Sequence, residues 1–290
     1  MSIIEKALEK QEVIGIQAPP VGEELDRAGF QDLSEEDRPV EQRVKSPQIK
    51  VNVEKLLAQG MLSPDASQGK LAEEYRLIKR PLLLNAFGEN RNKINNANLI
   101  LVTSSLPGEG KTFTAVNLAL SIAAERDKTV LLVDADVVKP ALSRLFGVEN
   151  RPGLIELLEH EATFAEVLLR TDIPKLTLLP SGRRHPHATE LLASEAMVQL
   201  AGDMSRRYPD RVIIFDSPPL LATTQASVLA THVGQVLLVV ESESTPQYIV
   251  KEAVEMLSSC ALVGCVLNKT TQGFGLGYYY YGYKYYYSNE

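Results

Sequence analysis

The amino-acid sequence predicts an α/β fold in which a mostly parallel sheet carries helices on both faces. Short apolar runs alternate with amphipathic segments between residues 99 and 267, and such runs are typical of strands buried on both faces. Polar residues directly follow several of these runs, among them Asp134, Asp216 and Asn268. Because ligands of such folds bind beyond the carboxyl ends of the strands, these residues predict one site at that edge.

The expected strands mostly alternate with helices, as the crossover connections of a parallel sheet require. The strands are expected at residues 99–102, 129–133, 176–180, 212–215, 235–240 and 261–267. The helices are expected at residues 113–123, 140–146, twice within 153–170, and at 190–207 and 247–258.

A glycine-bearing segment from Ser105 to Thr112 separates the first strand from its helix. It matches the phosphate-loop pattern G-x-x-x-x-G-K-[ST], except that Ser105 replaces the first glycine. Backbone N–H groups and the helix dipole favour an anion there. Lys111 can then reach the β- and γ-phosphates, and the Thr112 hydroxyl can ligate Mg²⁺. The sequence thus predicts a P-loop NTPase fold with ATP contacts at Ser105, Pro107, Gly108, Glu109, Gly110, Lys111, Thr112, Phe113 and Asn268.

Three aspartates end two further strands beside this loop. Asp216 follows four apolar residues, as a carboxylate that holds Mg²⁺ through water does. Asp134 and Asp136 share one face of their strand, so we expect one metal ligand and one proton acceptor. A single aspartate at a strand end is otherwise a helix cap. The expected catalytic set is Lys111, Asp134, Asp136 and Asp216, and the expected Mg²⁺ ligands are Thr112, Asp136 and Asp216.

Asn268 is the candidate contact to the nucleotide base. It begins an Asn-Lys-x-x sequence in which Thr271 stands where a guanine-reading site has aspartate. We therefore expect ATP rather than GTP.

Composition narrows the function classes. A formal net charge of −7 argues against a general nucleic-acid binder. No apolar run approaches the roughly 20 residues of a membrane-spanning helix, and no signal peptide is recognisable. We expect a cytoplasmic protein that reaches the inner face of the membrane only through a partner.

The chain divides into three parts by composition. Residues 1–69 are rich in acids and prolines and are expected to be a mostly disordered extension with short amphipathic helices, one of them at 53–57. Residues 70–272 form the predicted P-loop domain, and residues 273–290 a flexible tail. A helix is expected from residue 70 to an interruption at Pro81. Its charged residues, Glu73, Arg76 and Lys79, share one face, which is either a solvated surface or a subunit contact.

The tail concentrates the tyrosines. Eight of the eleven lie between residues 278 and 287, namely Tyr278, Tyr279, Tyr280, Tyr281, Tyr283, Tyr285, Tyr286 and Tyr287. Tyrosines this dense at a chain end predict a mobile segment. Beside an ATP site we interpret it as a phosphorylation substrate, the alternative being an adhesive aromatic tail.

Together, the phosphate loop, Asp134-Ala135-Asp136 and Asp216-Ser217-Pro218-Pro219 resemble the bacterial tyrosine kinases (BY-kinases) of polysaccharide loci. The form without a membrane segment is similar to the exopolysaccharide-locus autokinases found with exosortase (PEP-CTERM) systems. The resemblance implies an ATP-dependent kinase that phosphorylates its own tail in trans and regulates exopolysaccharide synthesis or export. It also implies a membrane polysaccharide co-polymerase as activator and a tyrosine phosphatase as partner.

The family's Glu-x-x-Arg-x-x-Arg helix, which assembles rings, matches Glu73 and Arg76, with Lys79 in place of the second arginine. The sequence departs from the family at Val138, where arginine is common, and at Gln225, where aspartate is frequent. The rival functions are a Min/Par-like nucleotide-switched ATPase and an ATP-dependent assembly module without kinase activity. The first rival usually has a signature lysine at the position of Leu106.

Overall fold

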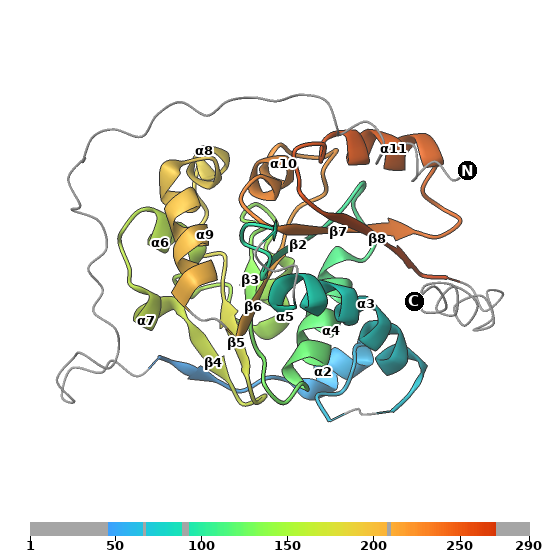
Figure 1. The fold of residues 1–290 in the computed structure, drawn as a ribbon. Coiled ribbons are helices and arrows are strands. Elements are labelled where there is room, and N and C mark those ends of the chain that lie inside the picture. The colour runs from blue at the N-terminus through green and yellow to red at the C-terminus, as the bar shows by residue number, and fades with distance from the viewer. Residues whose placement is uncertain (1–45, 66–67, 89–92, 208–209, 271–290) are drawn as a thin grey trace. The chain divides into compact units, whose positions relative to one another are not determined.

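The computed structural model describes residues 46–65, 68–88, 93–207 and 210–270, and Figure 1 shows how their elements are arranged. The strands are β1 (Gln48–Ile49), β2 (Leu99–Ser104), β3 (Thr129–Asp134), β4 (Leu169–Thr171), β5 (Leu176–Leu179), β6 (Arg211–Asp216), β7 (Gln235–Glu241) and β8 (Val263–Asn268). The helices are α2 (Val53–Ala58), α3 (Lys70–Phe87), α4 (Lys111–Ala123), α5 (Ala141–Phe146), α6 (Leu154–Leu158), α7 (Phe164–Val167), α8 (Ala188–Leu192), α9 (Glu195–Arg207), α10 (Gln225–Ala230) and α11 (Gln247–Glu255).

One eight-stranded sheet has the order β1-β4-β5-β3-β6-β2-β7-β8. In this order, each strand from β5 through β3, β6, β2 and β7 to β8 pairs with the next in parallel. β4 pairs with β5 in the antiparallel sense. The predicted α/β fold with a mostly parallel sheet is therefore confirmed. The carboxyl ends of β2, β3, β6, β7 and β8 meet at one edge, which is where the sequence predicts a site.

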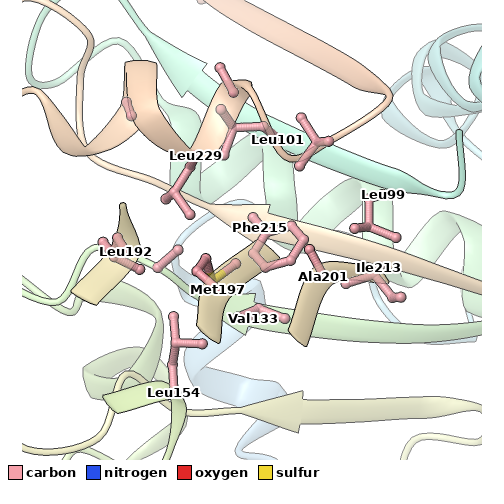
Figure 2. Close-up of a cluster of buried hydrophobic side chains, with 14 of the residues drawn as sticks. Leu99, Leu101, Val133, Leu154, Leu192, Met197, Ala201, Ile213, Phe215 and Leu229 are labelled. Atoms are coloured by element: carbon pink, nitrogen blue, oxygen red, sulfur yellow. The ribbon is translucent and has the colours of Figure 1, made fainter. Parts of the chain in front are cut away.

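Side chains alternate along the strands between two hydrophobic clusters, one on each face. Leu99 and Leu101 of β2 belong to one cluster, and Ile100 and Val102 belong to the other. Figure 2 shows the first cluster, in which Phe215 of β6 is drawn with side chains from α8, α9 and α10. The second cluster takes its helical side chains from α2, α3, α4 and α5. Helices thus cover both faces, as predicted.

Three expected helix boundaries were wrong. The helical segment expected to reach residue 170 ends at Val167, and β4 begins at Leu169. The helix expected to be interrupted at Pro81 runs on to Phe87 as α3. A proline removes one backbone donor, and burial of Tyr75, Leu82 and Ala86 along the helix offsets that loss. The single helix expected at 190–207 is two, α8 and α9, because Ser194 caps the second: its hydroxyl accepts the Met197 N–H at 3.4 Å.

Residues 46–65 contain a strand and a helix that join the domain, although they belong to the extension that was expected to be mostly disordered. β1 pairs with β4, and Leu56 of α2 is only 1% exposed in the second cluster. The short helix expected at 53–57 is present as α2. The apolar residues of this segment, though few, bury themselves on a domain that already exists, which an isolated short helix cannot do. Residues 1–45, which make up most of the expected extension, lie outside the described residues.

The buried side of α3 accounts for Lys79. Its ammonium donates to the Ser121 carbonyl at 2.6 Å and lies 2.6 Å from the Glu125 carboxylate. Glu73 and Arg76, by contrast, form an exposed ion pair with each other. Lys79 therefore does not share the face of Glu73 and Arg76, and it fastens α3 to the end of α4. No helix in the described part of the chain is long and apolar enough to cross a membrane.

We predict that Leu56→Ala lowers the free energy of unfolding by about 2–5 kcal/mol, because it leaves a cavity in the second cluster. Leu57→Ala is the matched control, since Leu57 is in the same helix but 47% exposed; its effect should be about 0.5 kcal/mol or less. Urea denaturation of the two variants measures both values. Equal, small effects would mean that α2 does not contribute to the core.

Candidate nucleotide-binding site

The phosphate loop connects β2 to α4 with the backbone geometry that anion binding requires. Gly108 and Gly110 have φ angles of 89° and 98°, in the left-handed region where side chains are strained. Gly110 immediately precedes α4, so the free N–H groups of the first helical turn begin at Lys111. Pro107 and Gly108 are exposed, and Lys111, Thr112 and Phe113 are half-buried.

Ser105, which replaces the first glycine of the motif, lies beneath the loop. It is fully buried, and its hydroxyl has no hydrogen-bond partner among the described residues. Its carbonyl accepts the Leu221 N–H at 3.3 Å, which ties the loop to the segment after β6. A direct contact between Ser105 and ATP stays a prediction.

Two of the predicted acids are register partners at the ends of neighbouring strands. Asp134 of β3 pairs with Asp216 of β6, and both are fully buried. The oxygens of Asp134 are engaged: they accept the Ser143 N–H at 2.7 Å and the Asp136 N–H at 3.3 Å. Asp134 thus holds the start of α5, which is the cap role that the sequence left open.

Asp136 faces the phosphate loop. Its Oδ2 lies 3.7 Å from the Lys111 ammonium, and its Oδ1 accepts the Lys139 N–H at 2.9 Å. The structure therefore brings together Lys111 and Asp136, two members of the expected catalytic set, and their catalytic roles stay a prediction. Asp134 and Asp136 are neighbours but serve different partners.

Asp216 differs from the other two because both of its carboxylate oxygens lack a hydrogen-bond partner in the described part of the chain. Burial raises its pKa to about 7, with Asp134 and Asp136 raising it further and Lys111 and the Thr112 hydroxyl opposing the shift. Burial likewise raises the pKa of Asp134 to about 6, although its hydrogen bonds from Ser143 oppose the shift. A buried carboxylate without partners is costly unless a cation or donor joins it.

The acids fit a magnesium ion that is held mostly by nucleotide and water. No group of three or more His, Cys, Asp or Glu residues that could hold a metal occurs among the described residues. Mg²⁺ bound with a nucleotide needs only one or two protein ligands, because phosphates and waters supply the rest. The partnerless oxygens of Asp216, near Thr112, are suited to that minimal role.

Asn268 has a role that the sequence did not predict. Its side-chain amide donates to the Glu109 carbonyl at 2.8 Å, so the end of β8 is hydrogen-bonded to the phosphate loop. A side chain at Gly110 would collide with this amide, which gives the second loop glycine a packing reason as well as a conformational one. Contact with the base stays a prediction.

The two departures at Val138 and Gln225 lie in different environments. Val138 is 50% exposed, near the Asp136 turn. Gln225 is buried and donates to the Thr189 hydroxyl at 3.2 Å, joining α10 to α8. The eight tail tyrosines lie outside the described residues.

Comparisons with known proteins find tyrosine-protein kinases among the similar sequences and among the similar solved structures. A family model described as "AAA domain" matches residues 97–263. The tyrosine-protein kinase YwqD of Bacillus subtilis is 33% identical over 215 residues, which make up 73% of this chain and 87% of YwqD. EpsB of Ralstonia nicotianae is 33% identical over 193 residues, 65% of this chain but only 25% of EpsB. Among solved structures, the BceF tyrosine kinase domain is 28% identical with a TM-score of 0.62, and the match covers 77% of this chain and 91% of that domain.

We predict that Asp216→Asn stabilises the protein when nucleotide and Mg²⁺ are absent. An unfolded aspartate has a pKa of about 3.9, whereas the folded Asp216 has a pKa of about 7. Between these values the unfolded state has lost the proton and the native state keeps it, so wild-type stability falls as pH rises from about 4 to about 7. The substitution removes the loss of stability that Asp216 causes, and the smaller loss that Asp134 causes remains.

Thermal unfolding at pH 5 and pH 8 measures this effect. The variant should gain about 1 kcal/mol or more over wild type at pH 8, with a smaller difference at pH 5. Asp65→Asn, at an exposed aspartate, controls for the change in net charge. A variant less stable than wild type at pH 8 would contradict the assignment of Asp216 as a strained buried acid.

Proposed function

The chain belongs to the bacterial tyrosine-protein kinases within the AAA domain family, and we propose that its phosphate-loop site transfers the γ-phosphoryl group of ATP to tyrosine side chains. The observation that carries this proposal is the Lys111 ammonium, which lies 3.7 Å from Asp136 at the start of α4. Phosphoryl transfer to a hydroxyl needs a cation for the phosphates and an acceptor for the proton, and this pair supplies one of each.

The transfer balances with groups of this chain. The tyrosine oxygen bonds to the γ-phosphorus, the bond from that phosphorus to the β–γ bridging oxygen breaks, and ADP leaves. When Lys111 turns to the phosphates, Asp136 loses its ion-pair partner and becomes the acceptor of the tyrosine proton. Thr112 and Asp216 are the residues that would hold magnesium, Asp216 through water, and the bound ion supplies neutralisation of phosphate charge.

Asp134 has a supporting part in this proposal. Its oxygens hold the Ser143 and Asp136 N–H groups, so it fixes the turn that carries Asp136. Asn268 and the loop residues Ser105, Pro107, Gly108, Glu109, Gly110 and Phe113 complete the proposed ATP site.

The proposed acceptors are the tail tyrosines from Tyr278 to Tyr287, which a neighbouring subunit phosphorylates in trans. The names of several similar proteins place them in tyrosine phosphorylation, and ExoP of Rhizobium meliloti is named for succinoglycan biosynthesis transport. We propose that this chain regulates exopolysaccharide synthesis or export. A membrane polysaccharide co-polymerase would activate it at the inner face of the membrane, and a tyrosine phosphatase would reverse the modification.

We predict that Lys111→Ala lowers tail phosphorylation at least 100-fold, because the cation that balances the phosphates is lost. Mass spectrometry of the purified full chain, after phosphatase treatment and incubation with ATP and Mg²⁺, measures the phosphotyrosine. Lys50→Ala removes an exposed lysine after β1 and serves as the control. Undiminished phosphotyrosine in Lys111→Ala would falsify the proposal, whereas ATP hydrolysis without phosphotyrosine in wild type would favour the Min/Par-like ATPase.

We also predict that Glu73→Lys and Arg76→Glu each weaken ring assembly and phosphorylation in trans, since both residues lie on the exposed side of α3. Lys79→Met is the matched variant on the same helix. Because Lys79 bonds within its own subunit, it should lower the thermal midpoint while leaving the sedimentation profile unchanged. If all three variants sediment as wild type does, the charges of α3 form only a solvated face.

A further inference from the structure

Glu109 is an acidic residue inside a loop built to bind phosphate anions, yet it is only 2% exposed. An unpaired carboxylate in that position would be costly to bury and would repel phosphates. The hydrogen-bond partners of the Glu109 carboxylate therefore have to account for its burial in this loop.

The Glu109 carboxylate is satisfied on both oxygens. One oxygen accepts the Leu106 N–H at 2.6 Å and so closes the loop on itself. The other accepts the Thr245 hydroxyl and, at 3.4 Å, the Glu241 N–H. The carboxylate thus joins two parts of the phosphate loop to the segment Glu241–Thr245 that follows β7.

The backbone of Glu109 is held as well. Its carbonyl accepts the Asn268 amide at 2.8 Å. Asn268 and Glu241 are register partners at the ends of β8 and β7, and the Ser242 N–H donates to the Asn268 carbonyl at 2.9 Å. The ends of these two strands form one block, which contacts the phosphate loop through both the carboxylate and the carbonyl of Glu109.

We propose that Glu109 is a positioning residue that holds the phosphate loop in its binding shape, and that the segment Glu241–Thr245 is thereby part of the nucleotide site. This inference rests on the ATP binding proposed above. Glu109 lies directly before Gly110 and Lys111, so movement of its carbonyl or carboxylate shifts the N–H groups that begin α4. The side chain of Glu109 acts on the nucleotide through the loop, because its carboxylate is engaged by Leu106, Glu241 and Thr245.

The direction of the mutational effect distinguishes positioning from simple charge. Removing a negative charge near an anion site should tighten nucleotide binding if charge alone acts. Loss of the loop's anchor should weaken it. We expect Glu109→Ala to raise the Kd for ADP with Mg²⁺ at least tenfold, as measured by calorimetry on the full chain. Glu109→Gln, which keeps one acceptor oxygen, should fall between the alanine variant and wild type.

The kinetics add a readout that a loss of folding would not mimic, and amide exchange locates the change in the loop. The KM for ATP should rise at least tenfold in Glu109→Ala, with kcat at saturating ATP within about threefold of wild type. The Leu106 amide should exchange with solvent faster in the nucleotide-free variant, because its acceptor is gone. Glu252→Gln removes an exposed charge on α11 and should change none of these values.

Thr245→Val is the second test variant, for use if Glu109→Ala does not fold. The threonine substitution removes one contact to the Glu109 carboxylate and keeps the sequence of the phosphate loop. It should weaken ADP binding and speed Leu106 exchange, by less than the alanine variant does. Equal or tighter ADP binding with unchanged Leu106 exchange, in whichever variant folds, would overturn the proposal. A further outcome is that wild type binds no ADP while the Leu106 amide still exchanges faster in the variants. That result would support the role of Glu109 in holding the loop and would contradict the proposed nucleotide site.

Discussion

Asp134 and Asp216 are register partners at the ends of β3 and β6, so the sheet forces two acidic side chains into one buried edge. Burial raises the pKa of both carboxyl groups, but the two differ in their hydrogen-bond partners. Asp134 accepts the Ser143 N–H of α5 and the Asp136 N–H, whereas both oxygens of Asp216 lack a hydrogen-bond partner among the described residues. Lys111 is the nearby cation that opposes the shift at Asp216. The site therefore stores an unfavourable burial that binding of a cation with its nucleotide can relieve.

The shape of the phosphate loop depends on neighbours from three strands. Beneath it, the Thr103 hydroxyl donates to the Pro218 carbonyl at 2.9 Å, and the Leu220 N–H donates to the Ser104 carbonyl at 2.8 Å. Beside it, Glu109 and Asn268 join it to the ends of β7 and β8. A glycine-bearing loop is flexible on its own, so these contacts supply the preorganisation that anion binding needs.

Helix α3 connects the proposed subunit contact with the site. Its exposed face carries the Glu73–Arg76 pair, while Lys79 reaches the Ser121 carbonyl near the end of α4. Because α4 begins at Lys111, one helix separates this contact from the phosphates. A lysine near a helix carboxyl end also interacts favourably with the helix dipole, which explains the tolerance for an almost buried ammonium.

The sequence by itself determined the parallel sheet, the phosphate loop and the acids at the ends of β3 and β6, since apolar runs, glycine spacing and strand-end acids are local signals. Only the tertiary structure decided which acid is satisfied, why Lys79 faces inward, and how residues 46–65 join the domain. It also decided the partners of the Glu109 carboxylate in the segment Glu241–Thr245, which lie 132 and 136 positions along the chain. A carboxylate inside an anion-binding loop was the one visible sign of that role. Such pairings depend on which strands become neighbours, and local propensity carries no information about contacts at that separation.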